Sequence, residues 1–191
     1  STRNNKKTYS FIDAFLNGLA HDGGLYIPKN IPHLSKSTLQ RFSQLNYNDL
    51  AYEVIKIYTE DTFSKAELKK IIKRSYDNFY SKNVIKFSRV KNFNLVELYH
   101  GPTLAFKDIA MQVIGNMYDV ILKKNKNRVN LVTATSGDTG AAAIDAVKNK
   151  KNIRIFVLHP KGKVSVTQRK LMTTVNSKNI FNIAVQGSFD D

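Results

Sequence analysis

The stretch that decides the fold is VNLVTATSGDTGAAAIDAV, residues 129–147. It opens with an apolar segment, residues 129–134, continues through a loop of small residues, and ends in an alanine-rich segment. A short apolar run that ends at a glycine loop predicts a buried strand, and the alanine-rich run predicts a helix. A strand, a glycine loop and a helix in this order are typical of one unit of an α/β fold.

The same alternation continues on both sides of this stretch. Residues 153–158 and 180–185 predict further buried strands, and a helix is expected from about residue 165 to residue 174. Upstream, residues 95–99 predict a strand that leads into Gly101-Pro102, where a helix is expected to start. Apolar strands that alternate with helices predict a parallel sheet covered on both faces, so the expected fold class is α/β.

The N-terminal part of the chain carries a helical pattern instead. Ser10 is a potential N-cap for a first helix, and residues 50–58 show the spacing of a second, amphipathic helix. The capping box at residues 64–67 precedes a third helix. We therefore expect a small helical region before the α/β part.

The change of pattern near Val84 predicts two domains. We expect a helical N-terminal domain over residues 1–84 and a partial parallel-sheet α/β catalytic domain over residues 85–191. The alternation stops at Asp191, where another helix is expected, so the second domain is predicted to be truncated at its C-terminus.

Composition narrows the classes of function. The chain has 191 residues, 42% of them hydrophobic, and no cysteine, which excludes disulfides and thiolate metal sites. The spacing of the four histidines predicts no metal site. No apolar run is long enough for a bilayer and no signal-peptide pattern is present, so we expect a cytoplasmic protein without membrane partners. The net charge of +15 leaves a basic nucleic-acid-binding module as an alternative, although the lysines are scattered rather than clustered.

One lysine is the candidate for covalent chemistry. Lys107 belongs to HGPTLAFKD, residues 100–108, and is expected about one turn into its helix beside Phe106. The helix dipole and the apolar neighbours would favour the neutral amine, which can attack an aldehyde and then move a proton. The alternative is an ordinary surface lysine.

The loop TSGDTG, residues 135–140, is a candidate anion site. Its glycines permit close approach to a ligand, Ser136 and Thr139 add hydroxyl donors, and its N–H groups are expected to converge at a helix N-terminus. Ligands of open α/β sheets bind at this carboxyl edge. The alternative is a tight turn that requires glycine.

Lys163, in the basic turn after the next strand, is expected at the same edge, where it could meet a phosphate or remain solvated. A Schiff-base lysine beside an anion cradle predicts pyridoxal-phosphate chemistry.

The chain resembles the threonine synthases, which are fold-type II pyridoxal-phosphate enzymes, along nearly its whole length. The segments that carry the resemblance are STR at 1–3, GLAHDGGLYIP at 18–28, HGPTLAFKD at 100–108, ATSGDTG at 134–140, PKGKVS at 160–165, MTTV at 172–175 and FDD at 189–191. The run LAFKD, residues 104–108, is the most specific of them.

The resemblance implies that Lys107 holds pyridoxal 5'-phosphate as a Schiff base and catalyses conversion of O-phospho-L-homoserine and water to L-threonine and phosphate. It also implies that the serine–glycine loop holds the substrate α-carboxylate. The implied contacts are Thr135, Ser136, Gly137, Asp138, Thr139 and Gly140. An ionised Asp138 would repel a carboxylate, so its side chain is expected to point away or to bond a nearby hydroxyl.

The resemblance further implies that the cofactor-phosphate loop lies beyond Asp191. We therefore expect residues 1–191 alone neither to hold the cofactor tightly nor to turn over substrate. The enzyme alternatives are a threonine dehydratase or a cysteine synthase, which lack this type of leader before Val84. A remnant that keeps the fold without activity is a further alternative, and the oligomeric state is left open.

Overall fold

The computed structural model describes residues 1–59, 61–188 and 190, so the closing FDD motif of the resemblance lies largely outside the described residues. The chain forms two compact units, Ser1–Ile72 and Lys73–Asp191. The domain boundary predicted near Val84 stays a prediction. No helix of the described residues is both long and apolar enough to cross a membrane.

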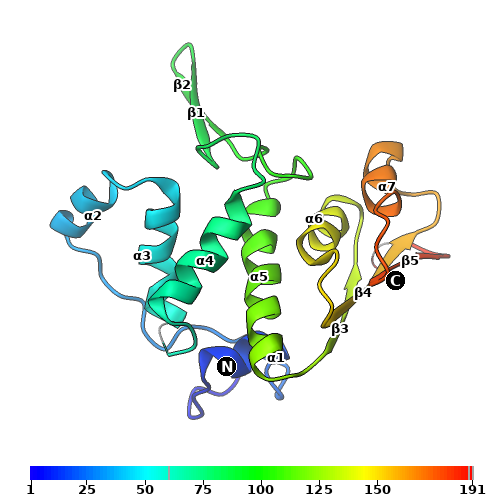
Figure 1. Ribbon diagram of the computed structural model, residues 1–191, viewed down its shortest axis with the longest axis horizontal. Coiled ribbons are helices and arrows are strands. Elements are labelled where there is room, and N and C mark those ends of the chain that lie inside the picture. The colour runs from blue at the N-terminus through cyan, green and yellow to red at the C-terminus, as the bar shows by residue number, and fades with distance from the viewer. Residues whose placement is uncertain (60, 189, 191) are drawn as a thin grey trace. The chain divides into compact units, whose positions relative to one another are not determined.

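Helices are the main secondary-structure elements of the first unit (Figure 1). They are α1 (Phe11–Asn17), α2 (Lys36–Phe42), α3 (Tyr47–Thr59) and the first part of α4 (Lys65–Tyr76), which continues into the second unit. The predicted cap of α1 is confirmed, because the Ser10 hydroxyl accepts the N–H of Asp13 at 3.1 Å. The capping box is confirmed as well. The Ser64 hydroxyl accepts the N–H of Glu67, and the Glu67 carboxylate accepts the N–H of Ser64.

The second unit contains an antiparallel hairpin that the sequence did not reveal. Its strands are β1 (Lys86–Val90) and β2 (Phe93–Glu97). The strand expected at 95–99 therefore exists in shifted form, and it pairs with its own neighbour rather than with the parallel sheet. The reversal is local because Lys91 adopts a left-handed backbone conformation, with a φ of 53°, in the turn between the two strands.

The helix expected from Pro102 begins later. It is α5 (Asp108–Lys124), and Lys107 is its N-cap residue rather than a residue one turn inside it. The start moves because the Asp108 carboxylate accepts hydrogen bonds from the N–H and the hydroxyl of Thr103, at 2.8 and 2.6 Å. Leu104, with a φ of 60°, turns the chain between them. The intervening residues form turns instead of a first helical turn.

The parallel sheet predicted from the alternation is confirmed. Its strands are β3 (Val129–Ala134), β4 (Ile153–Pro160) and β5 (Ile180–Val185), and its order is β3-β4-β5. The connections contain α6 (Asp138–Val147) and α7 (Val166–Thr173). Strands β3 and β5 have the predicted bounds, and β4 runs two residues further than expected.

The core of this unit lies on one face of the sheet. Ile155 and Val157 of β4 are buried against Ile144 of α6 and Met172 of α7, and side chains of α5 pack onto the same cluster. Figure 1 shows α5 and α6 side by side, in agreement with their contacts. On the other face Val132 is 71% exposed, so the described residues cover the sheet on one side, not on both as expected. The strand order β3-β4-β5 advances in one direction, and right-handed crossovers then place both connecting helices on the same face, which explains the difference.

Candidate active site

Lys107 and Asp138 meet where two helices begin. The Nζ of Lys107, at the N-cap of α5, donates to Oδ2 of Asp138, the first residue of α6, at 2.7 Å. The same Nζ lies 4.3 Å from the ring centroid of Phe106. The side chains of the ion pair are 27% and 35% exposed, so solvent and small molecules can reach both. An amine, a carboxylate and an aromatic face thus gather at two helix N-termini.

Asp138 was expected to point away from a bound carboxylate or to bond a nearby hydroxyl; its hydrogen-bond partners are instead an amine and a backbone N–H group, and the first alternative stays a prediction. Its Oδ2 accepts from Lys107 and its Oδ1 accepts the N–H of Thr139 at 2.9 Å. The hydrogen bond from Lys107 is the main cause that lowers the pKa of Asp138 below the ordinary value, and partial burial opposes it. Sequence reasoning missed this pair because the two residues are 31 positions apart and meet only when α5 packs on α6.

Thr135 supports the loop rather than facing a ligand. It is 1% exposed, and its hydroxyl accepts the N–H groups of Gly137 and Gly140 at 3.0 and 2.9 Å. Two of the N–H groups that were expected to form an anion cradle therefore already have partners inside the protein. Besides Asp138, the loop residues open to a ligand are Ser136, which is exposed, and Thr139, which is half-buried.

The two glycines of the loop are required by packing. A Cβ on Gly140 would lie 2.5 Å from Cγ2 of Thr135 and 2.8 Å from Sδ of Met172. Gly137 has a φ of 149°, and a Cβ there would lie 2.4 Å from Oε1 of Gln168 in α7. The glycines let the loop approach the strand and α7, which is a different reason from the close ligand approach expected from the sequence.

The basic turn after β4 lies at the expected edge of the sheet. The backbone N–H of Lys161 donates to the carbonyl of Val185, the last residue of β5, at 2.9 Å. Lys163 is exposed in the same turn. The helix expected from about residue 165 is confirmed as α7, whose cap Ser165 accepts the N–H of Gln168 at 3.2 Å. A contact between Lys163 and a phosphate stays a prediction.

Two histidines lie near strand ends. Nε2 of His100 lies 2.9 Å from Oε2 of Glu97, so this ring is held at the end of the hairpin. His159, near the carboxyl end of β4, is 8% exposed, and its Nδ1 has no hydrogen-bond partner in the described part of the chain. His159 lies on the buried side of a strand, where a single histidine in an apolar run gives no sequence signal of a functional role.

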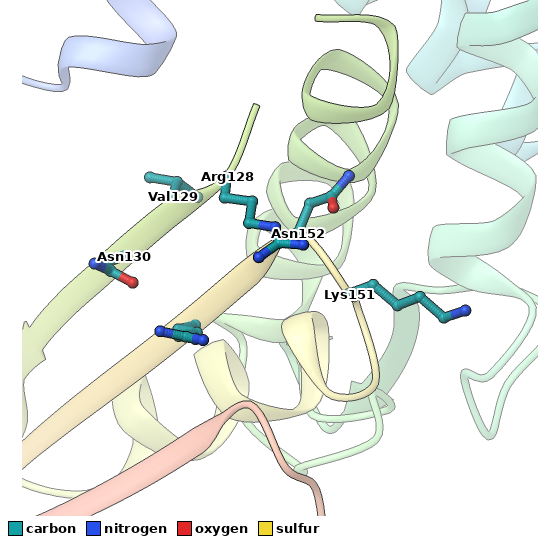
Figure 2. A pocket seen from close by; sticks show the side chains of 6 residues that line it. Arg128, Val129, Asn130, Lys151 and Asn152 are labelled. Atoms are coloured by element: carbon teal, nitrogen blue, oxygen red, sulfur yellow. The ribbon is translucent and has the colours of Figure 1, made fainter. Parts of the chain in front are cut away.

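A cavity of about 190 Å³ lies at the opposite edge of the sheet (Figure 2). Its lining residues are Arg128, Val129, Asn130, Lys151, Asn152 and Arg154, at the amino ends of β3 and β4. Figure 2 shows Lys151 extending away from the other labelled side chains, so its charge does not converge with that of Arg128. Across residues 1–59, 61–188 and 190, no group of three acidic or histidine side chains could hold a metal ion.

Comparison with known proteins gives consistent matches along the chain. Residues 1–76 match the family described as the threonine synthase N terminus. The chain is 42% identical over its whole length to threonine synthase of Pseudomonas aeruginosa, and 40% identical to that of Saccharomyces cerevisiae. It covers 41% and 40% of those two proteins. A crystal structure of threonine synthase from Brucella melitensis with bound pyridoxal phosphate matches the whole chain with a TM-score of 0.92 and 37% identity, and the match covers 41% of that protein.

The fold and the lysine at its glycine loop place this chain in the class of α/β proteins to which that pyridoxal-phosphate-bound enzyme belongs. Within this class the chain is similar along its whole length to the threonine synthases and corresponds to their N-terminal portion. It spans about 40% of the length of the curated relatives reported above.

Proposed function

We propose that this chain supplies the Schiff-base lysine of a pyridoxal-phosphate-dependent threonine synthase, which converts O-phospho-L-homoserine and water to L-threonine and phosphate. The observation that carries the proposal is the position of Lys107. Its amine is accessible and lies beside the serine–glycine loop, in a chain that is 42% identical to a threonine synthase over its whole length. We also propose a cytoplasmic location.

The residues of this edge fit such a cofactor. Lys107 provides an accessible primary amine, and the exposed ring of Phe106 provides an apolar face next to it. The N-termini of α5 and α6 carry partial positive charge, which suits anionic groups. When bound, pyridoxal phosphate supplies an aldehyde for the amine and a conjugated ring that takes up an electron pair from carbon.

The side chains divide the remaining work. Nζ of Lys107 takes a proton from a substrate carbon and returns it at another, as a general base and then a general acid. The hydroxyls of Ser136 and Thr139, at the start of α6, bind the substrate carboxylate. The Asp138 carboxylate repels that group and so restricts it to the side of the loop away from Lys107. Lys163 is our candidate for the substrate phosphate, since it is exposed at the same edge.

The other enzyme readings have less support. The match of residues 1–76 to the threonine synthase N terminus favours threonine synthase over a threonine dehydratase or a cysteine synthase. A nucleic-acid-binding module would require a gathered basic patch. In the cavity of Figure 2, Lys151 extends away from the other side chains, which does not favour that reading.

Trapping with borohydride tests the assignment of Lys107. The chain is mixed with pyridoxal phosphate, reduced, digested and analysed by mass spectrometry. We expect the pyridoxyl label at Lys107, and we expect dialysis before reduction to remove it, because the chain alone holds the cofactor weakly. Lys107→Arg should abolish this label, and Lys73→Arg, which changes an exposed lysine, should leave it unchanged. A label spread evenly over the lysines would refute the assignment.

A chimera tests the reaction. Residues 1–191 replace the matching part of the Pseudomonas aeruginosa relative, and phosphate, threonine and ammonia are measured with O-phospho-L-homoserine as substrate. We expect equal amounts of phosphate and threonine, and loss of both with Lys107→Ala. Ammonia in place of threonine would instead indicate a dehydratase.

A further inference from the structure

The carboxylate of Asp138 is anchored to the backbone through one oxygen and contacts Lys107 through the other. Its Oδ1 accepts the N–H of Thr139 at 2.9 Å, which leaves Oδ2 directed at Nζ of Lys107 at 2.7 Å. A carboxylate that is anchored to the backbone holds its partner in one place, unlike a pair of two long, freely rotating side chains. Asp138 therefore both fixes the position of the Lys107 amine and accepts a hydrogen bond from it.

We propose that Asp138 is a positioning residue that holds Lys107 as an ammonium ion at the N-terminus of α6, so that the amine reacts with an aldehyde only when this ion pair opens. The proposal rests on the proposed function only in that the aldehyde is taken to be that of pyridoxal phosphate. Its chemistry applies to any small aldehyde that reaches Lys107.

The charges around Nζ of Lys107 show why Asp138 is the group that can keep this amine as an ammonium ion. Lys107 lies at the N-terminus of α5 and meets that of α6, and both helix dipoles disfavour a positive charge there. On α5, the Asp108 carboxylate is turned to Thr103 and is not available. In the turn after β4, Lys161 and Lys163 are exposed cations that cannot stabilise an ammonium ion. Asp138 is the carboxylate in contact with the amine.

The covalent step then has a defined order. The ammonium of Lys107 first loses a proton to solvent, since the lowered pKa of Asp138 makes that carboxylate a poor acceptor. The free amine adds to the aldehyde carbon, a C=N bond replaces the C=O bond, and water leaves. An approaching anionic ligand can open the ion pair by competing for the amine.

Reductive methylation measures the availability of the amine without any cofactor. The chain is treated with formaldehyde and a borane reductant between about pH 6 and pH 11, a range that brackets the usual lysine pKa, and the peptide that contains Lys107 is quantified by mass spectrometry. We expect Asp138→Asn to raise the labelling rate of Lys107 about two- to fivefold at pH 7, the upper part of the range for a partly exposed ion pair. Near pH 11 the two proteins should react equally, because the amine is then largely free in both.

The exposed ion pair between Lys73 and Asp77, also at 2.7 Å, provides a matched control. Asp77→Asn should leave the labelling of Lys107 unchanged and should change that of Lys73 by less than twofold, because both side chains of that pair are about half exposed or more.

Two results would overturn the proposal. One is an unchanged pH profile in Asp138→Asn, and the other is a rate that rises equally at every pH, which would indicate only a looser structure. If that variant does not fold, the wild type is compared at low salt and at about 1 M salt, where screening should speed the labelling at pH 7 and an unchanged rate refutes the proposal. Failure of pyridoxal phosphate to label Lys107, with the formaldehyde profile as expected, would refute the proposed function alone.

Discussion

The hydroxyl oxygen of Thr135 lies 2.9 Å from the backbone nitrogen of Gly140 and accepts its hydrogen bond. Gly140 belongs to the first turn of α6, where backbone N–H groups have no partner within the helix. Gly137, the N-cap residue, has no side chain to cap them. The residue that directly follows β3 thus caps α6 from outside and fixes the loop that precedes Asp138.

Thr135→Val removes this cap at nearly constant volume. The N–H groups of Gly137 and Gly140 are then buried without an acceptor, so we expect the free energy of unfolding to fall by about 1–3 kcal/mol. Urea titration followed by circular dichroism measures it. Thr135→Ser keeps the hydroxyl and should lose less. No loss in Thr135→Val would contradict a stabilising role of these two hydrogen bonds.

Gly140→Ala tests the close packing of α6. The new methyl group meets Cγ2 of Thr135 and Sδ of Met172, so we expect a loss of about 1–3 kcal/mol from overpacking. The double variant with Thr135→Ser removes one of the two opposing atoms, so its loss should be smaller than the sum of the single losses. Strict additivity in urea titrations would contradict the predicted clash with Thr135.

Asp108 predicts a pH dependence of stability. Burial raises its pKa above the ordinary value of 3.8, although hydrogen bonds from Thr103 oppose the shift. The folded state therefore holds the proton more strongly than the unfolded state. This contribution to stability is complete below pH 3.8 and is lost as the pH rises through the folded-state pKa.

Asp108→Asn removes that titration. We expect the free energy of unfolding of the wild type, relative to this variant, to fall as the pH rises above 3.8 and then to become constant. Urea titrations across this range provide the measurement. A relative stability that increases with pH would mean that the bonds from Thr103 outweigh burial.

The two faces of the sheet predict unequal costs of truncation. Val157 is fully buried, so Val157→Ala should lower the free energy of unfolding by about 2 kcal/mol. Val132 is 71% exposed, and Val132→Ala should change it by less than about 0.5 kcal/mol. The same denaturant titration compares them. A large loss in Val132→Ala would show that a partner, such as a second copy of the chain, covers this face.

The amino-acid sequence by itself determined the elements of the sheet. The strand bounds of β3 and β5, the caps Ser10 and Ser165, and the capping box at Ser64 follow from local patterns, because apolar spacing and cap hydrogen bonds involve residues only a few positions apart. Lys107 could also be identified as the candidate Schiff-base lysine from its local motif and the resemblance of that motif to a family. The assignment of its role stays a prediction.

Only the tertiary structure determines which side chains of the candidate site contact one another. The pairing of Lys107 with Asp138 depends on α5 packing against α6, and no spacing rule reports a contact across 31 residues. Helix α5 also begins later than expected, because the Asp108 carboxylate accepts hydrogen bonds from the backbone N–H and the hydroxyl of Thr103. Hydrogen bonds of this kind are made by side chains after the chain has folded, so a one-dimensional pattern does not contain them.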